Sequence, residues 1–115
     1  MVTGRVQSSL APKEQLINRL LQWITGKPMV RGRMFQDLLP QGDAVWELKT
    51  ADLRIFGWIY RPRKFIAVRG GYADDYKEPT KIKFYGDDRR AVVEARDVLP
   101  LDGEKFVMGD YDELV

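Results

Sequence analysis

Three runs of β-branched and aromatic residues, separated by very short connections, constrain the fold of this chain most strongly. The runs are Val45 to Lys49, Leu53 to Tyr60 and Lys64 to Gly70, joined by Thr50-Ala51-Asp52 and Arg61-Pro62-Arg63. Runs of this composition predict strands. Parallel neighbours need a crossover of about a dozen residues or more, so connections this short require antiparallel pairing. The sequence therefore predicts an antiparallel meander of at least three strands.

A helix is predicted before the sheet, from Pro12 to Thr25. Proline suits its first turn, apolar residues recur at helical spacing, and glycine and proline follow its last residue. We expect the stripe of Leu16, Leu20 and Ile24 to pack on one face of the sheet. A second, shorter helix is predicted from about Arg31 to Leu39, with the inward-facing residues Met34, Phe35, Leu38 and Leu39.

The sequence after the sheet predicts a loop from Gly71 to Pro79 and a third helix that ends before Pro100. Residues 81 to 85 predict a brief strand or a turn into this helix, and Asp87 or Asp88 is its expected cap. Residues 1 to 9 and 101 to 115 are expected to be loose tails, although apolar patches at 2 to 6 and 106 to 108 could add edge strands.

These elements predict the α+β class in a single domain. An antiparallel meander of three to five strands would be packed by two N-terminal helices and one C-terminal helix.

The 115 residues include no cysteine and no histidine. These gaps exclude a disulfide framework, the common zinc and haem sites, and catalytic triads built on histidine. The carboxylate pairs Asp74/Asp75 and Asp87/Asp88 match no recognised metal-binding spacing. No metal or other cofactor is therefore expected, and any chemistry would rest on Lys, Arg, Tyr, Asp and Glu.

Charge is distributed unevenly along the chain. Residues 1 to 69 contain 12 Lys/Arg and 5 Asp/Glu, whereas residues 70 to 115 contain 7 and 12, so the two parts carry +7 and −5. This asymmetry is typical of an anion-binding face or a self-complementary surface, but scattered solvated charge would look the same. No run approaches the roughly 20 apolar residues that span a bilayer, so a cytoplasmic protein without membrane contact is expected.

Alternation in the second strand places Arg54, Phe56, Trp58 and Tyr60 on one face. Aromatic rings stack on unpaired bases and guanidinium groups bind phosphate, so this face suits single-stranded RNA. The alternative is that a helix covers the face as part of the core. Further cations that could follow an RNA backbone from one sheet edge to a hairpin tip are Lys49, Arg61, Arg63, Lys64 and Arg69. A solvated hairpin tip would have the same sequence.

The order of these segments resembles the HigB-like branch of the RelE toxin superfamily over about residues 16 to 98. Trp46-Glu47-Leu48-Lys49 is similar to the family's Trp-Glu-Leu-Arg strand, and Arg54-Ile55-Phe56 to its Tyr-Arg-Val-Phe strand. The segments Phe65 to Tyr72 and Ala91 to Arg96 extend the likeness. The chain departs from the family at Ala73-Asp74-Asp75, where a lysine pair is usual, and at Arg69, where histidine is common.

The resemblance implies a toxin that cleaves mRNA, usually on the ribosome, through attack of a 2′-hydroxyl on the adjacent phosphate, and that is inhibited by a cognate antitoxin. Arg54 is the catalytic residue carried over by the motif, with Lys77 and Tyr85 as candidate partners and Tyr72 as a further RNA contact. Asp74 and Asp75 would repel the developing charge, so weak cleavage is expected. Two alternatives stay open: a toxin-fold binding module that does not cleave, and an assembly domain whose aromatic strip forms a homodimer interface.

Overall fold

The computed structural model describes residues 10 to 115, which form an α+β fold. The helices are α1 (Pro12–Ile24), α2 (Tyr85–Val98) and the short α3 (Tyr111–Leu114), with 3-10 turns at Gln41–Asp43 and Ala73–Tyr76. The strands are β1 (Phe35–Asp37), β2 (Trp46–Lys49), β3 (Leu53–Arg61) and β4 (Lys64–Tyr72). They pair antiparallel in the order β1-β2-β3-β4. The predicted meander is therefore confirmed.

The register of the sheet fixes which residues of neighbouring strands lie together. Lys49 of β2 lies opposite Arg54 of β3, and Arg54 lies opposite Gly71 of β4. At the far end of the same hairpin, Arg61 lies opposite Lys64. The two ends of the β3–β4 hairpin thus carry separate groups of cations.

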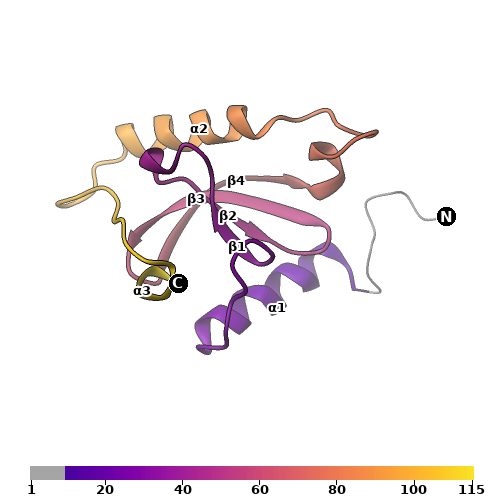
Figure 1. The fold of residues 1–115 in the computed structure, drawn as a ribbon, viewed down its shortest axis with the longest axis horizontal. Helices are drawn as coiled ribbons and strands as arrows, with labels where there is room; N and C mark the ends of the chain where they lie inside the picture. Colours follow the sequence, from indigo (N-terminus) through magenta and orange to yellow (C-terminus); the bar gives the residue numbers. More distant parts are fainter. Residues whose placement is uncertain (1–9) are drawn as a thin grey trace.

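The helices cover opposite faces of the sheet (Figure 1). On one face, α1 contributes Leu16, Leu20 and Trp23 to a cluster that contains Phe35 and Trp46. On the other, Val92 of α2 packs in a cluster with Phe56 and Trp58. Ile24 was predicted to join the α1 stripe, but it is 77% exposed because the helix ends there and Trp23 occupies the inward position.

The predicted helix at residues 31 to 39 is wrong. This segment forms the edge strand β1, so only one N-terminal helix packs on the sheet. Phe35 is fully buried and stacks on Trp46 at 5.0 Å between ring centroids, while Gly32 has a φ of 81° that a helix does not allow. Pairing with β2 satisfies the backbone of residues 35 to 37 and buries the apolar side chain that had suggested a helix.

The segments after the sheet also differ from the prediction. Strand β4 continues to Tyr72, and no strand forms at residues 81 to 85 or 106 to 108 of the described part of the chain. Helix α2 begins two residues before Asp87, its N-cap is Phe84, and Asp88 is buried instead of capping. The C-terminal residues form α3, whose Leu114 packs into the core at 3% exposure, where a loose tail was expected.

The predicted weak strand at residues 2 to 6 lies outside the described residues. Among residues 10 to 115, no helix is both long enough and apolar enough to cross a bilayer.

Candidate nucleic-acid interface

The cations predicted to bind RNA do not form one continuous surface. Arg61, Arg63 and Lys64 lie at the β3–β4 turn, whereas Lys49, Arg54 and Arg69 lie toward the opposite end of the sheet. Arg54 and Arg61 are seven positions apart along β3, which corresponds to roughly 23 Å. The two groups could contact one RNA only as distant sites.

Phe56 and Trp58 are not available to stack on bases in this structure. Both side chains have 0% exposure beneath α2, and the Trp58 indole donates a 2.8 Å hydrogen bond to the carbonyl of Lys105. The prediction that they contact RNA is therefore wrong for this structure, and the alternative, a core face covered by a helix, is correct. Burial of a large aromatic side chain stabilises the fold in proportion to the apolar area removed from water, so full burial is more favourable than partial exposure.

Arg61 is held by the C-terminal segment. Its guanidinium donates to the carbonyls of Asp102 and Glu104 and lies over the ring of Tyr60, with 4.0 Å from Cζ to the ring centroid. Arg63 and Lys64 are exposed at the turn beside it. The turn therefore presents two cations to solvent, while Arg61 anchors the chain.

A second group of polar residues gathers at the opposite end of the sheet, on the α2 face. We call it the polar cluster, and it consists of Glu47, Lys49, Arg54, Arg69, Tyr76, Lys83, Tyr85 and Asp88. Strands β2 to β4 supply Glu47 and the cations Lys49, Arg54 and Arg69, and the segment 76 to 88 brings the tyrosines and Asp88 over them. The structure thus brings together two of the three predicted catalytic residues, Arg54 and Tyr85.

Glu47 is the centre of this cluster. Its carboxylate is fully buried, accepts a 2.8 Å hydrogen bond from Gln36, and lies 3.7 Å from Nε of Arg54 and 3.8 Å from Nζ of Lys49. Arg54 is itself only 8% exposed and donates to the carbonyls of Thr50 and Leu53. The two carbonyls therefore orient the guanidinium, and the buried carboxylate beside it supplies the counter-charge without a hydrogen bond to Nε.

The two tyrosines of the cluster are stacked, with ring centroids 4.9 Å apart, and both pack on Phe56. Burial, followed by the nearby Glu47 carboxylate, raises the pKa of Tyr85 to about 12, although Arg54 acts in the opposite direction. Burial and Asp88 raise the pKa of Tyr76 above its ordinary value. Both phenols consequently stay protonated at neutral pH and can donate a hydrogen bond or a proton.

The cations Arg69 and Lys83 lie beside the tyrosines. Arg69 forms a 2.8 Å ion pair with Asp88 while its own side chain stays 46% exposed. A Cβ atom on Gly71 would lie 3.0 Å from Nζ of Lys83 and 3.1 Å from the hydroxyl of Tyr76, so these two groups are neighbours. The absence of a side chain at Gly71 leaves room for both.

Lys77 and Tyr72 do not join the cluster. Lys77 follows the 3-10 turn and is exposed. Tyr72 is on the face opposite Gly71, because side chains alternate along β4. Asp75 is buried in the turn, and its carbonyl accepts hydrogen bonds from the backbone of Ile82 and Lys83. The turn from Ala73 to Tyr76 thus positions Lys83.

Glu47, Tyr76, Lys83 and Asp88 belong to the site but were not predicted as site residues. A signal existed for Glu47, since a single acid on the covered face of a central apolar strand requires a buried cation. No comparable signal marks the other three residues, because their positions depend on how the loop from 73 to 84 folds back over the sheet.

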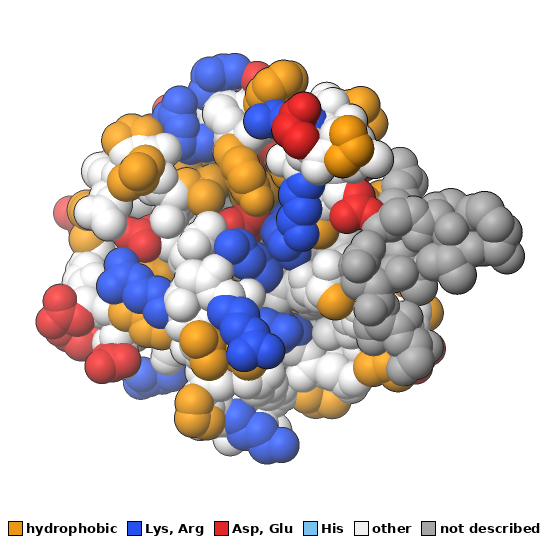
Figure 2. All heavy atoms as spheres, turned by 45° about the vertical axis from the view of Figure 1, so that its right-hand side comes forward, with side chains coloured by type: hydrophobic (Ala, Val, Ile, Leu, Met, Phe, Trp, Pro, Cys, Tyr) orange, Lys and Arg blue, Asp and Glu red, His pale blue; other side chains and the backbone are white. Residues whose placement is uncertain are grey.

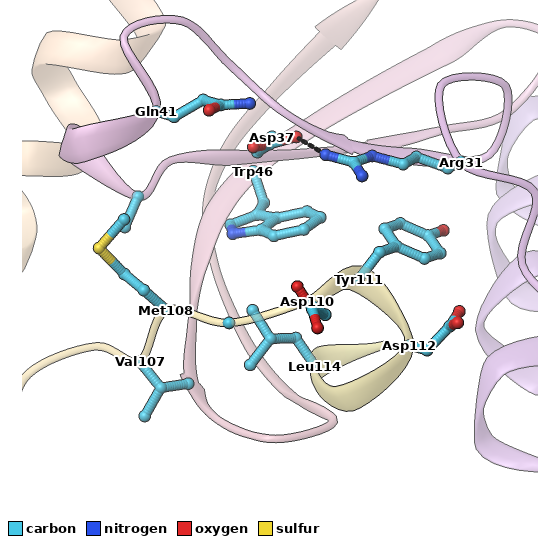
Figure 3. Close-up of a pocket in the computed structure, with 12 residues that line it drawn as sticks. Arg31, Asp37, Gln41, Trp46, Val107, Met108, Asp110, Tyr111, Asp112 and Leu114 are labelled. Carbon is cyan, nitrogen blue, oxygen red and sulfur yellow. Dashed lines mark hydrogen bonds and ion pairs between the residues drawn. The ribbon is translucent and has the colours of Figure 1, made fainter.

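The surface has one cavity beside the polar cluster and another away from it. A hollow of about 420 Å³ adjoins Tyr85 and Arg89. A cavity of about 430 Å³ lies between β1, β2 and the C-terminal segment, where Trp46 and Tyr111 line one side and the Arg31–Asp37 ion pair another (Figure 3). None of the predicted site residues lines this second cavity. Of the polar cluster, Tyr85 alone lines either cavity, and Glu47, Arg54, Tyr76 and Asp88 are buried.

Figure 2 shows the face of the molecule at the end of the sheet that carries the cluster. Lys and Arg side chains form a band down the middle of this face, next to a hollow with hydrophobic side chains. Among residues 10 to 115, no three His, Cys, Asp or Glu side chains lie close enough together to hold a metal ion.

Comparison with known proteins found no matching family model, no matching curated protein and no matching solved structure.

Proposed function

We propose that this chain binds single-stranded RNA at the polar cluster, as expected for a toxin of the RelE/HigB type. The observation that carries the proposal is the convergence of Arg54, Arg69 and Lys83 with two protonated tyrosines at one end of the sheet. Cations bind the phosphate backbone and phenol rings offer faces and donors to unpaired nucleotides. Tyr85 remains partly exposed, so its ring is the accessible member of the tyrosine pair.

The same groups suit cleavage by a 2′-hydroxyl without a metal. In that reaction the 2′-hydroxyl loses its proton to solvent water as its oxygen forms a bond to phosphorus, the bond from phosphorus to the 5′-oxygen breaks, and the 5′-oxygen takes up a proton. Arg69 and Lys83 would stabilise the charge on the phosphate, and a tyrosine with a raised pKa would supply the proton. Glu47 is inaccessible to the substrate, so its role would be to position Arg54 and Tyr85.

A second candidate function is RNA binding without cleavage. Arg54 favours it, since two carbonyls and Glu47 already surround its guanidinium and 8% of the residue is exposed. An arginine whose donors are already occupied contributes little to the binding of a phosphate outside the cluster. In this version Arg69 and Lys83 bind the backbone, and the chain acts on the ribosome or on its antitoxin as a binding module.

The test for cleavage is incubation of purified protein with a single-stranded RNA and with the same RNA carrying a 2′-deoxy nucleotide at each position in turn. Cleavage of the first and not of the substituted RNA, reduced at least a hundredfold by Tyr85→Phe, supports the ribonuclease. Binding of both substrates without cleavage supports the binding module. Absence of binding at low salt contradicts both versions.

A further inference from the structure

The cavity between β1, β2 and the C-terminal segment (Figure 3) has no part in the proposed function. One of its walls is Trp46, whose neighbour Glu47 belongs to the polar cluster. Because side chains alternate along a strand, these two residues point to opposite faces of β2, and the cavity lies on the same face as α1. Its volume of about 430 Å³ is within the usual range for a ligand-binding pocket.

Hydrogen bonds fix the wall of this cavity that comes from residues 107 to 114. The backbone N–H of Val107 donates to the carbonyl of Ile59 at 3.1 Å, and the carbonyl of Leu114 accepts from the β3–β4 turn at 2.7 Å. Between these two points, the hydroxyl of Tyr111 donates at 2.9 Å to a carbonyl of the segment that joins α1 to β1. The cavity is therefore preformed, and a ligand would not have to order this segment on binding.

Trp46 carries a hydrogen-bond donor that the fold leaves unused. The residue is only 5% exposed, and its indole stacks on Phe35 with 5.0 Å between ring centroids. Its Nε1 donates no hydrogen bond within residues 10 to 115, yet the atom is not sealed in the core, so it is open to the cavity. In Figure 3 this nitrogen lies on the Met108 side of the indole, away from Tyr111. A ligand that covers it must offer an acceptor at this point.

Carboxylates outnumber cations around the cavity. Asp37, Asp110 and Asp112 line it together with one cation, Arg31, so its formal charge is −2. Asp37 lies 3.1 Å from Arg31 and neutralises it, whereas Asp110 and Asp112 form no ion pair within the described part of the chain. The cavity therefore repels a phosphate group and attracts a cation.

Arg31 shows which kind of cation these walls accept. Its guanidinium lies over the ring of Tyr111, with 5.5 Å from Cζ to the ring centroid, while it pairs with Asp37. Trp46 continues the aromatic wall, with its ring centroid 6.0 Å from that of Tyr111. A guanidinium is planar and its fork of donors matches a carboxylate, so a second one suits the two unpaired carboxylates and the aromatic wall together. An ammonium group lacks this planarity.

We propose that this cavity binds the side chain of an arginine residue from a partner polypeptide. The guanidinium pairs with the carboxylates of Asp110 and Asp112 and lies against Trp46. A backbone carbonyl next to the bound arginine accepts the hydrogen bond from the indole Nε1. Because none of these residues belongs to the polar cluster, the site is independent of RNA binding.

The first experiment follows the indole N–H signals of the full chain by NMR, with N-acetylarginine amide as the probe. The chain has three tryptophans, and Trp46→Phe identifies the signal of Trp46. We expect the probe to shift this signal in a saturable way and to shift the other two less. N-acetylcitrulline amide, in which a neutral urea replaces the guanidinium, should bind at least about tenfold more weakly. Absence of a saturable shift, or equal binding of the two probes, would overturn the proposal.

Amide variants test the two carboxylates. Asp110→Asn/Asp112→Asn should weaken binding of the arginine probe by about tenfold or more, because charge-assisted contacts are lost. Both side chains are exposed and Asp110 makes no capping hydrogen bond, so the variant is expected to fold. The matched control Glu104→Gln/Glu113→Gln removes two negative charges from the same segment at positions that do not line the cavity, and it should bind like the wild type. An equal loss in both double variants would mean that only the overall charge acts, which contradicts the proposal.

Two further probes identify the source of the guanidinium. Propylguanidine, the arginine side chain alone, lacks a backbone carbonyl for the indole N–H and should bind more weakly than N-acetylarginine amide. Equal or tighter binding of propylguanidine would refute a polypeptide ligand in favour of a free guanidine. Single-stranded RNA should leave the Trp46 signal in place, whether or not it binds at the polar cluster. A saturable shift of this signal with RNA would refute the proposal in favour of a nucleic-acid site.

Discussion

At the scale of single residues, the buried acid Glu47 distinguishes this sheet from an ordinary apolar one. It is the only fully buried carboxylate that faces Arg54, Lys49 and Tyr85 together within the described residues. An ion pair of this kind gives little net stability, but breaking it leaves an uncompensated charge in the core. The arrangement is therefore better explained by the positioning of Arg54 and Tyr85 than by stability.

Replacing Glu47 with Gln is expected to lower the free energy of unfolding by about 3 to 5 kcal/mol, because Arg54 would stay buried without its counter-charge. A urea melt of the variant measures this change. Glu14→Gln, at an exposed position of α1, is the matched control and should change stability by less than about 0.5 kcal/mol. Similar effects for both variants would contradict the role given to Glu47.

The stability of the protein at alkaline pH is expected to depend on Tyr85. Its pKa is about 12 in the folded state, above the value of about 10 for an unfolded tyrosine, so the folded state retains the proton longer. The contribution is complete below pH 10 and is lost as pH rises toward 12. Unfolding free energies measured by denaturant melts across this range should therefore fall less steeply in Tyr85→Phe. An identical slope in the two proteins would show that Tyr85 ionises normally.

At the scale of elements, α1 illustrates how a sequence pattern can identify a helix and misplace part of its buried face. Leu16 and Leu20 pack on the sheet as predicted, but Trp23 takes the place expected for Ile24. The helical period is compatible with two apolar sides of α1. Leu16, Leu20 and Trp23 lie on the side that packs on the sheet, and Ile17 and Leu21 lie on the other side, where they are exposed. Only the tertiary contacts of Trp23 with Phe35 and Phe65 decide between them.

Two alanine variants of α1 test this assignment. Leu20→Ala is expected to lower the free energy of unfolding by about 2 kcal/mol, near the lower end for leucine because the side chain is only partly buried. Ile24→Ala, which removes a similar apolar volume at a 77% exposed position, should have almost no effect. A larger loss from Ile24→Ala in a denaturant melt would mean that the helix packs through its other side.

At the scale of the whole molecule, local sequence patterns were sufficient to predict the meander but not to predict which residues form the polar cluster. The β2, β3 and β4 strands follow from composition and short connections, and both long helices follow from their apolar period. The β1 segment was misread because Phe35 is buried through contacts distant in sequence, with Trp23, Trp46 and Phe65. The polar cluster joins residues from 47 to 88, and its geometry depends on a loop whose path no periodic pattern encodes.

The whole fold also explains why the RNA-binding surface differs from the one expected along β3. Helix α2 covers Phe56 and Trp58, so the accessible groups move to the sheet end, where Arg69, Lys83 and Tyr85 border the helix.

The central claim, that RNA binds at the polar cluster, is tested most directly by titrating single-stranded RNA into the wild type and the double variant Arg69→Gln/Lys83→Gln. Each lost phosphate contact should reduce the magnitude of the salt slope of log K by about 0.7, so the double variant should bind more weakly, with a slope smaller by about 1.4. The control Arg90→Gln changes an exposed arginine of α2 that pairs with Asp87 and should bind like the wild type. Equal affinity and salt slope for the double variant and the wild type would contradict the account.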